Sequence, residues 1–224
     1  MKTLVIIPAY NEQDTIYNVV TQVKNCGLEV DVLVINDGSN DCTYQKAVQA
    51  GAEVIDLPLN VGIGGAVQTG YLYALYKDYD IAVQIDGDGQ HNPKYLNKLI
   101  QPLIDDKADM VIGSRFLEET GYTPSFFRSI GIRYFSRLVS RITHKPIFDT
   151  TSGFRAINRK TIELFAKYYP SDYPEVETIV YCSSRGIRIS EVPVCMNYRQ
   201  GGKSSITPIK SIYYMIKVTL SIVL

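Results

Sequence analysis

Short apolar runs alternate with stretches of helical periodicity through the first half of the chain, and this alternation limits the possible folds more than any other feature. We expect strands at 4–7, 30–35, 53–57, 81–85 and 110–112, with helices between them at 12–26, 43–50, 62–76 and 93–104. Strands and helices that alternate over short connections form a mainly parallel sheet with helices on both faces. The sequence therefore predicts an α/β protein with a Rossmann-like sheet.

The second half of the chain is less regular. Helices are predicted at 157–169 and 174–184, and a strand at 187–196. Pro193 lacks the amide hydrogen that an interior strand needs, so this strand is expected at an edge of the sheet. The N-terminal apolar run reaches Pro8 after only four residues, which predicts a strand rather than a signal peptide and hence a cytoplasmic protein.

The C-terminal segment 209–224 is mostly apolar, and we treat it separately from a domain that covers 1–208. It is shorter than the ~20 residues that a membrane-spanning helix needs. Its apolar residues recur at helical spacing, which predicts an amphipathic helix. Such a helix suits a membrane surface, packing onto the domain, or contact with a second copy of the chain in a homo-oligomer.

The charge balance argues against one class of partner. The chain has 23 Lys and Arg and 23 Asp and Glu, for a formal net charge of zero. Nucleic-acid-binding proteins usually carry a marked basic excess, so we expect no nucleic acid partner. Basic charge is concentrated locally, because Arg133, Arg137 and Arg141 recur along one predicted helix face beside an apolar stripe. Such a helix suits an anionic membrane surface or a lipid phosphate, or is an ordinary exposed helix.

Three polar clusters follow three of the predicted strands, at 8–12, 36–41 and 86–91. Each cluster alone is better explained by a helix cap or an Asx-turn, which are common uses of Asp and Asn. Ligands of parallel sheets bind outside the carboxyl ends of the strands. The three clusters together therefore predict one shared binding site.

The spacing of Asp86 and Asp88 predicts a metal site. In an extended segment, side chains two residues apart point the same way, and two adjacent carboxylates repel unless a cation lies between them. Gln90 continues the alternation with a neutral oxygen. Oxygen ligands suit Mg²⁺ or Mn²⁺, and Mg²⁺ commonly takes substrate phosphates as further ligands.

Three cations are candidates for binding a phosphate group. Arg115 follows the fifth predicted strand, and Arg199 and Lys203 flank a pair of glycines. Arginine and lysine bind phosphate through charge-assisted hydrogen bonds. The competing interpretations are a surface ion pair for Arg115 and a solvated loop for the other two.

Seven short blocks occur in order along the chain. They are Pro8-Ala9-Tyr10-Asn11-Glu12, Asp37-Gly38-Ser39, Asn60-Val61-Gly62, Asp86-Gly87-Asp88-Gly89-Gln90-His91, Gly113-Ser114-Arg115, Ser152-Gly153-Phe154-Arg155 and residues 199–204. Together they resemble glycosyltransferase family 2, and within it the dolichyl-phosphate mannose synthase and polyprenyl-phosphate glycosyltransferase branch. The resemblance implies the GT-A fold and a metal-dependent enzyme that moves a sugar, with inversion, from a GDP- or UDP-sugar to a polyprenyl phosphate. A lipid acceptor implies a peripheral location at the cytoplasmic face of a membrane.

The resemblance also implies roles for individual residues. The nucleotide is expected to contact Pro8, Tyr10, Glu12, Ile35 and Asp37. The ribose, sugar and diphosphate are expected to contact Asp86, Gly87, Asp88, Arg115, Arg199 and Lys203. Asp88 is expected to act in catalysis and to hold the metal together with Gln90, and the acceptor is expected to contact Ser152, Arg128 and Arg133.

Two features depart from patterns in the wider family. Asn36 stands where many relatives have Asp, although Asp37 is kept. The chain contains no Trp, so it lacks the Gln-x-x-Arg-Trp pattern of processive polysaccharide synthases. Processive synthesis is therefore not expected.

The acceptor decides whether the reaction needs a base. A phosphate oxygen is already anionic, so positioning and electrostatics suffice, whereas a sugar hydroxyl needs a carboxylate base. Asp149 is the first candidate for the catalytic acid group near the acceptor and Glu177 the second; a turn residue and a solvated helix carboxylate are the alternatives.

Three other functions compete with transfer to a polyprenyl phosphate. The first is transfer to a saccharide or lipid-linked glycan in surface polysaccharide synthesis. The second is an inactive homologue that binds nucleotide sugars. A nucleotidyltransferase is disfavoured, because the glycine-rich loop with Arg or Lys that such enzymes carry after the first strand is absent here.

Overall fold

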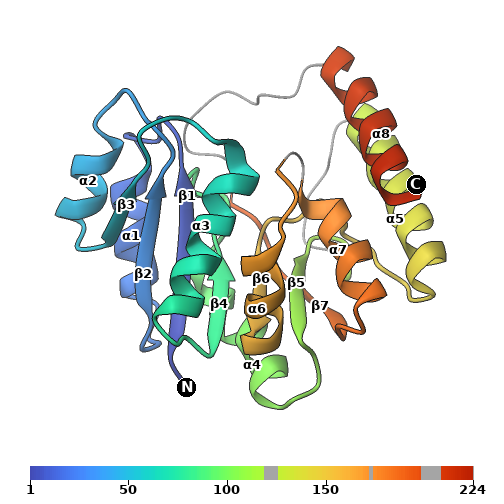
Figure 1. Cartoon of the computed structure of the whole chain (residues 1–224), viewed down its shortest axis with the longest axis horizontal. Coiled ribbons are helices and arrows are strands. Elements are labelled where there is room, and N and C mark those ends of the chain that lie inside the picture. Colours follow the sequence, from blue (N-terminus) through green and yellow to red (C-terminus); the bar gives the residue numbers. More distant parts are fainter. Residues whose placement is uncertain (119–125, 172–173, 198–207, 224) are drawn as a thin grey trace.

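The computed structural model describes residues 1–118, 126–171, 174–197 and 208–223, and a seven-stranded sheet lies at its centre (Figure 1). The strands are β1 (Thr3–Ala9), β2 (Asp31–Asn36), β3 (Glu53–Asp56), β4 (Ile81–Gln84), β5 (Met110–Ser114), β6 (Arg155–Asn158) and β7 (Ile189–Pro193). Their order across the sheet is β3-β2-β1-β4-β6-β5-β7. Neighbouring strands are parallel except where β6 pairs with β4 and β5. The predicted mainly parallel α/β fold is confirmed.

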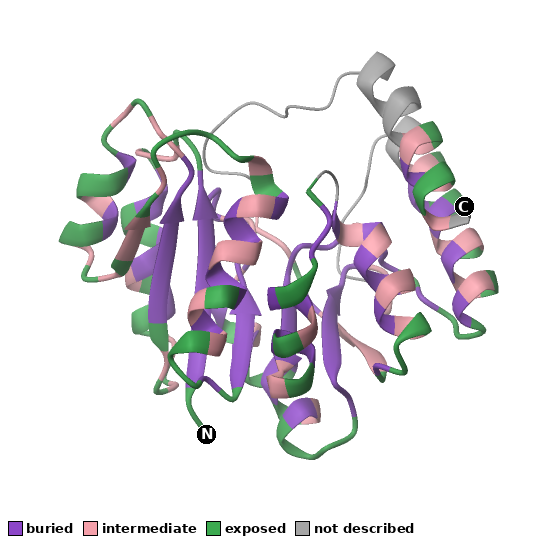
Figure 2. Cartoon of the chain, in the orientation of Figure 1, coloured by how far each residue is buried: buried purple, intermediate pink, exposed green. Residues whose placement is uncertain are grey.

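Helices cover both faces of the sheet (Figure 1). On one face lie α1 (Ile16–Lys24), α2 (Thr43–Gln49) and α4 (Leu96–Ile104), the last entered through a short 3-10 turn, η1 (Pro93–Tyr95). On the other lie α3 (Gly62–Tyr76), α6 (Arg159–Lys167) and α7 (Pro174–Ser184). Alternate side chains of a strand point to opposite faces, so Ile6 joins the core under α3 whereas Val5 joins the core under α1. The inner strands of the sheet are almost wholly buried between these two cores, whereas the edge strands β3 and β7 are partly exposed (Figure 2).

The prediction of a helix over 157–169 is wrong at its start. Ile157 pairs in β6 with Ala82 of β4 and Met110 of β5, and α6 begins at Arg159. A strand this short between polar residues carries too little periodicity to be recognised. The boundary itself has a local cause, because the Asn158 side chain caps α6 by accepting the Thr161 N–H at 3.1 Å.

The predicted edge position of the last strand is confirmed. β7 pairs only with β5 among the described strands, and it ends at Pro193, opposite Ser114. The missing amide hydrogen of Pro193 therefore falls where the ladder stops.

Two further helices, α5 (Phe126–Thr143) and α8 (Pro208–Val223), lie side by side at one end of the molecule next to α7 (Figure 1). The Tyr134 hydroxyl hydrogen-bonds to Thr219 Oγ1 at 3.0 Å across this pair, and Val218 is buried. The predicted C-terminal helix therefore forms and packs against the rest of the chain. Within the described residues, every helix is too short or too polar to cross a bilayer.

The fold brings separate loops to one edge of the sheet, the upper edge in Figure 1. The parallel strands β1, β2, β4 and β5 all end at this edge. Because β6 runs the opposite way, the segment that precedes it, residues 149–154, reaches the same edge. The predicted polar clusters and the Asp149 loop therefore meet there.

Candidate active site

The loops after β1 and β2 are tied together by hydrogen bonds. The Asn11 N–H donates to Ser39 Oγ at 2.9 Å, and the Asn40 N–H donates to Asn11 Oδ1 at 2.9 Å. The Glu12 N–H donates to Thr43 Oγ1 at 2.8 Å. Asn11 has a φ of 54°, a left-handed conformation that Asn adopts more readily than most residues. The structure therefore joins the first two polar clusters into one rim of the site.

The residues predicted to hold the nucleotide differ in their exposure. Pro8 and Ile35 are buried, whereas Tyr10 is 47% exposed at the rim. Asn36 is buried and donates from Nδ2 to Asp56 Oδ1 at 2.6 Å, while its Oδ1 finds no partner among the described residues. Tyr10 is therefore the member of this set whose ring is open to a ligand.

Asp37 caps a helix from another element. Its carboxylate accepts the N–H of Val61 at 2.7 Å and of Gly62 at 3.0 Å, at the start of α3. A carboxylate at a helix N-terminus satisfies unpaired amides and complements the helix dipole. Gly38 follows with a φ of 66°, and a Cβ there would lie 2.7 Å from the Asn60 nitrogen. Asp37 thus fixes α3 against the β2 loop, a link that the sequence did not reveal.

The Asp86–Asp88 segment is not an extended strand end, and this part of the metal argument is wrong. β4 stops at Gln84, and Gly87 and Asp88 lie in a turn. The Asp86 side chain is 38% exposed, whereas Asp88 is buried and accepts the Gln90 N–H at 3.0 Å. The two carboxylates therefore occupy unlike environments instead of sharing one face.

Asp86 and Gly87 are held in place from several sides. The Thr15 hydroxyl donates to the Gly87 carbonyl at 2.7 Å, and a Cβ on Gly87 would lie 3.2 Å from the Pro8 carbonyl oxygen. His91 Nδ1 accepts the Asp86 N–H at 3.0 Å, which places the ring proton on Nε2, 3.6 Å from Asp86 Oδ2. The His91 ring stacks on Phe154 with centroids 4.9 Å apart. Gly87 thereby brings the β4 loop against the β1 loop.

Arg115 and Asp149 form a buried ion pair. Arg115 Nε donates to Asp149 Oδ2 and its second terminal nitrogen donates to Oδ1, both at 2.7 Å. The Arg115 N–H also donates to Asp149 Oδ2 at 3.0 Å, and the guanidinium reaches Thr151 Oγ1 at 2.7 Å. The exposed fractions are 6% for Arg115 and 0% for Asp149. The structure thus joins a predicted phosphate-binding residue to the predicted catalytic acid, and the surface ion pair considered for Arg115 is wrong.

Arg155, at the start of β6, ties the Asp149 loop to α7. It is buried and donates to the carbonyl of Ser152 at 2.8 Å and of Glu175 at 2.6 Å, and to the Thr178 hydroxyl at 2.6 Å. Ser152 is also buried, and its hydroxyl accepts the Phe154 N–H at 3.3 Å. No role for Arg155 was predicted from the sequence, because only the three-dimensional fold brings α7 beside it.

The structure favours Glu175 over Glu177 as the acidic residue of α7 nearest the site. Burial raises the pKa of Glu175; the Arg155 charge opposes the rise and the Asp86 charge adds to it. The Glu175 carbonyl accepts a hydrogen bond from Arg155 at 2.6 Å, which ties this residue to the Asp149 loop. Positions two apart on a helix are rotated by about 200°, so Glu177 projects from the opposite face. Its carboxylate accepts a hydrogen bond from the Tyr168 hydroxyl at 3.2 Å.

The remaining predicted residues lie outside this cluster or outside the described part of the chain. Arg133 is exposed on α5. Arg199, Lys203 and the side chain of Arg128 fall outside the described residues, so their predicted contacts stay predictions. Among the described side chains there is no group of three or more His, Cys, Asp or Glu that could hold a metal.

Comparison with known proteins decides the family. Residues 4–165 match the model of the family described as "Glycosyl transferase family 2". The chain belongs to glycosyltransferase family 2. It is 31% identical to the undecaprenyl-phosphate mannosyltransferase of Micrococcus luteus, over 92% of this chain and 88% of that protein. It is 29% identical to the polyprenol monophosphomannose synthase of Mycolicibacterium smegmatis, over 92% of this chain and 81% of that protein.

Solved structures support the fold of this family 2 glycosyltransferase. The glucosyl-3-phosphoglycerate synthase of Mycobacterium tuberculosis, solved with Mn²⁺, UDP and glucosyl-3-phosphoglycerate, superposes with a TM-score of 0.75 at 23% identity, over 98% of this chain and 79% of that one. The same synthase has been solved with Mg²⁺ and UDP. The predicted GT-A fold is confirmed by this similarity.

Proposed function

We propose that this glycosyltransferase moves a sugar, with inversion, from a nucleotide-diphosphate sugar to a polyprenyl phosphate. The proposal rests on the loops after β1, β2 and β4, which meet around the partly exposed Asp86. It is supported by the similarity of the chain to transferases named for polyprenol and undecaprenyl phosphate. The exposed ring of Tyr10 at the rim suits a nucleobase, and the carboxylates after β4 suit the sugar and diphosphate end of the donor.

A divalent metal fits this site with ligands shared between protein and donor. Asp88 and Gln90 are the expected protein ligands, and Asp86 adds a solvent-open carboxylate next to them. One or two carboxylates, completed by substrate phosphates and water, is the usual way in which proteins bind Mg²⁺. When bound, such an ion stabilises the charge that develops on the departing nucleoside diphosphate.

Asp149 is better suited to hold Arg115 in position than to act as a catalytic base. Its Oδ2 accepts two hydrogen bonds from Arg115, and its Oδ1 accepts one from Arg115 and one from the Thr151 N–H. All four lone pairs of this buried carboxylate are therefore engaged, and none is left for a substrate hydroxyl. An acceptor phosphate is anionic near neutral pH and attacks without proton removal, so the chain has to align it and exclude water. The catalytic role predicted for Asp149 stays untested.

Transfer to a saccharide hydroxyl is the second candidate function, because Glu175, beside Arg155, is a carboxyl group whose pKa is raised by burial. We expect Glu175→Gln to lower kcat by less than about tenfold with a phosphate acceptor, since no base is needed, and by ~100-fold or more with a hydroxyl acceptor. Glu177→Gln, on the opposite helix face, is the matched control. Equal losses in the two variants would remove Glu175 from the reaction.

One experiment separates the proposed acceptors. GDP- and UDP-sugars are each incubated with undecaprenyl phosphate, dolichyl phosphate or candidate saccharides, with Mn²⁺, Mg²⁺ or EDTA. We expect sugar on a polyprenyl phosphate, with loss of transfer in EDTA. Transfer to saccharides alone would overturn the acceptor assignment, and the absence of any donor turnover would support an inactive homologue.

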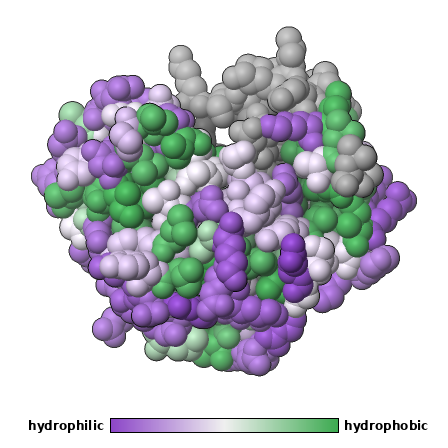
Figure 3. Space-filling model, in the orientation of Figure 1, coloured by the Kyte–Doolittle hydropathy of each residue, from purple (hydrophilic) through white to green (hydrophobic). Residues whose placement is uncertain are grey.

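The α5–α8 pair is the proposed contact with the membrane in which such an acceptor resides. Along α5 runs an open groove of about 480 Å³, lined by Ile130, Arg133, Tyr134, Arg137, Leu138 and Arg141. Ile216 and Leu220 of α8 are also exposed. Figure 3 shows apolar and hydrophilic surface interleaved at this end of the molecule. Cations among exposed apolar side chains suit an anionic bilayer surface.

Liposome flotation tests this surface. The variant Arg133→Ser, Arg137→Ser, Arg141→Ser is compared with a charge-matched control in and next to α4, which packs on the other face of the sheet from α5: Lys94→Ser, Lys98→Ser, Lys107→Ser. Since each basic residue near an anionic surface contributes about 1 kcal/mol, the arginine variant is expected to lose most of its binding to phosphatidylserine or phosphatidylglycerol vesicles. Equal flotation of the two variants would contradict the assignment.

A further inference from the structure

A carboxylate on the edge strand holds the backbone of the Asp149 loop. Glu191 lies in the middle of β7, in register with Ile112 of β5. Its Oε2 accepts the Phe148 N–H and its Oε1 accepts the Asp149 N–H, both at 2.8 Å. The Ser114 hydroxyl, at the end of β5, also hydrogen-bonds to it. One side chain therefore satisfies two consecutive amides of a loop that has no strand partner at this point.

Placing a carboxylate here has a cost in folding free energy. Burial raises the pKa of Glu191, and the neighbouring charge of Asp149 raises it further. No lysine or arginine of the described residues forms an ion pair with it, so the backbone amides and the Ser114 hydroxyl must offset the desolvation of the charge. A neutral side chain of similar size would pack at the edge strand without this cost. A glutamate at position 191 is therefore best explained by the need for two acceptor oxygens, one for each of the Phe148 and Asp149 amides.

The held segment leads directly to the donor site. Asp149, whose N–H Glu191 fixes, aligns the Arg115 guanidinium, and Arg115 in turn binds the Thr151 hydroxyl. Two residues later, Gly153 packs on Asp86: a Cβ at Gly153 would lie 3.1 Å from Asp86 Oδ1. Because only a few residues separate Asp149 from Gly153, a shift of the backbone at residues 148–149 is expected to move Gly153 and, with it, the Asp86 carboxylate.

We propose that Glu191 is a positioning residue of this glycosyltransferase, which anchors the 148–153 loop so that Arg115 and Asp149 pair and Gly153 supports Asp86. This inference rests on the proposed function in one respect, namely that Asp86 binds the donor. Nothing in it requires Glu191 to touch a substrate. Its effect on the reaction passes through the loop.

The test compares Glu191→Gln with Asp109→Asn. Asp109 also accepts a backbone N–H, but it lies just before β5, away from the site. Gln keeps one acceptor oxygen but turns an NH₂ group toward the second amide. Asp109 is buried and accepts the Arg188 N–H at 2.8 Å, just before β7, so Asp109→Asn is the matched control. We expect Glu191→Gln to lower kcat/KM for the donor by ~10-fold to ~100-fold, as supporting residues of binding sites usually do.

Amide hydrogen exchange supplies a readout that needs no substrate. In Glu191→Gln we expect faster exchange at the amides of Phe148 and Asp149, whereas Asp109→Asn should leave those amides protected and kcat/KM within about twofold of the parent, at a temperature where both variants are folded. Unchanged kcat/KM in Glu191→Gln, or an equal loss in Asp109→Asn, would overturn the proposal. Failure of the proposed function is a different result, in which the parent chain itself transfers no sugar.

Discussion

At the scale of single residues, the site depends on side chains that satisfy backbone groups of other loops. Asp37 accepts hydrogen bonds from the first amides of α3, His91 accepts one from the Asp86 amide, and Glu191 accepts one from the Asp149 amide. Buried backbone donors must find acceptors, and these polar side chains are acceptors in places where no strand ladder can form. Asp37, which the family resemblance marks for substrate contact, therefore also holds the site together, as do His91 and Glu191, for which no substrate contact was predicted.

The Arg115–Asp149 pair gives a prediction at this scale. Asp149→Asn leaves a buried guanidinium with half of its partner, so we expect a loss of about 3 kcal/mol in unfolding free energy, measured by urea denaturation. The double variant Arg115→Met, Asp149→Leu removes both charges and should recover much of that stability without restoring activity. A single variant as stable as the parent would show that the ion pair contributes little to folding.

Two residue-level predictions depended on features that only the fold supplies. The alternation argument for Asp86 and Asp88 assumed an extended chain, but β4 ends at Gln84 and the segment turns. Glu177 was proposed without knowing which face of α7 meets the sheet, and its role stays a prediction. Neither the end of a short strand nor the rotation of a helix about its axis is encoded in local spacing.

At the scale of elements, close approaches through glycine connect the strands to the loops. Gly70 lets α3 lie against β1, where a Cβ would come within 2.4 Å of the Ile6 side chain. Gly64 lets the start of α3 approach the segment after α6, where a Cβ would lie 2.1 Å from the Pro170 carbonyl oxygen. Glycines at the start and in the middle of α3 therefore let this helix pack closely on two sides.

Gly153 gives the element-scale prediction. In Gly153→Ala the added methyl group would sit 3.1 Å from Asp86 Oδ1 and 3.2 Å from Gln84 Nε2, so the Asp86 carboxylate must shift. We expect KM for the donor to rise ~10-fold, by analogy with other misplaced supporting groups, with a smaller change in stability. The control is Gly131→Ala in α5, where the nearest described atom to an added Cβ is Met215 Sδ at 4.0 Å. Equal donor KM in the two variants would contradict contact between the loop and Asp86.

The sequence predicted several helices well because long periodic segments with capping glycines carry a strong local signal. α3 in the first half and α7 in the second have the predicted bounds, 62–76 and 174–184. β6 escaped prediction because its four residues are paired on both sides by strands distant in sequence, Ile81–Gln84 and Met110–Ser114. The same distant pairing places Arg155 and Gly153 at the site, so their contribution was invisible before the fold was known.

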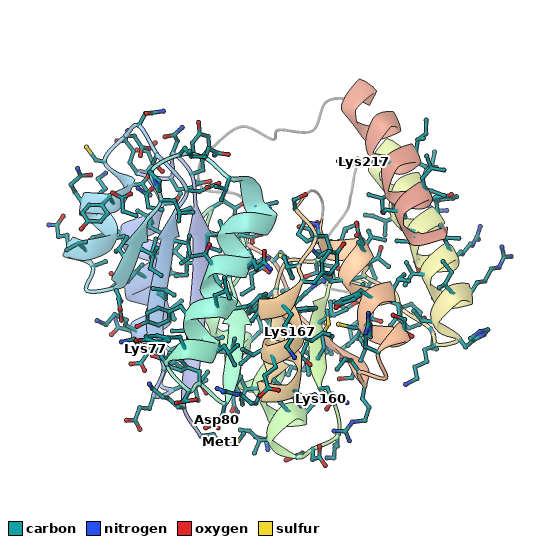
Figure 4. All side chains as sticks on the ribbon, viewed as in Figure 1. Met1, Lys77, Asp80, Lys160, Lys167 and Lys217 are labelled. Atoms are coloured by element: carbon teal, nitrogen blue, oxygen red, sulfur yellow. The ribbon has the colours of Figure 1, made fainter. Side chains whose placement is uncertain are left out.

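At the scale of the whole molecule, the edge of the sheet away from the site carries a compact ionic network. Asp109 is buried, pairs with Arg188 at 3.0 Å and Lys160 at 3.6 Å, and accepts from Asn158 Nδ2 at 2.9 Å. Figure 4 places Lys160 at this lower edge. The network joins the starts of β5, β7 and α6, so it ties the second half of the sheet together without touching the site.

This network predicts how stability depends on pH. Hydrogen bonds and ion pairs with Arg188 hold the pKa of Asp109 well below its usual value, against the effect of burial. A lowered pKa contributes stability that is present above the unfolded-state value of about 4 and is lost as the pH falls below it. Between about pH 5 and pH 3 we therefore expect the urea midpoint of the parent to fall more than that of Asp109→Asn. Parallel decreases in both proteins would contradict this assignment.

The antiparallel strand β6 also sets an order of events during folding. Until residues 155–158 have been synthesised, β4 has a strand partner on one side only, and its other edge offers unpaired amides and carbonyls to any neighbouring chain. During much of its synthesis, the nascent protein therefore has its N-terminal strands in place while one edge of β4 is unpaired. We therefore expect aggregation and chaperone binding to be strongest for ribosome-bound or truncated chains that stop before Arg155. In chains that also lack Gly153, Asp86 has no support from that residue.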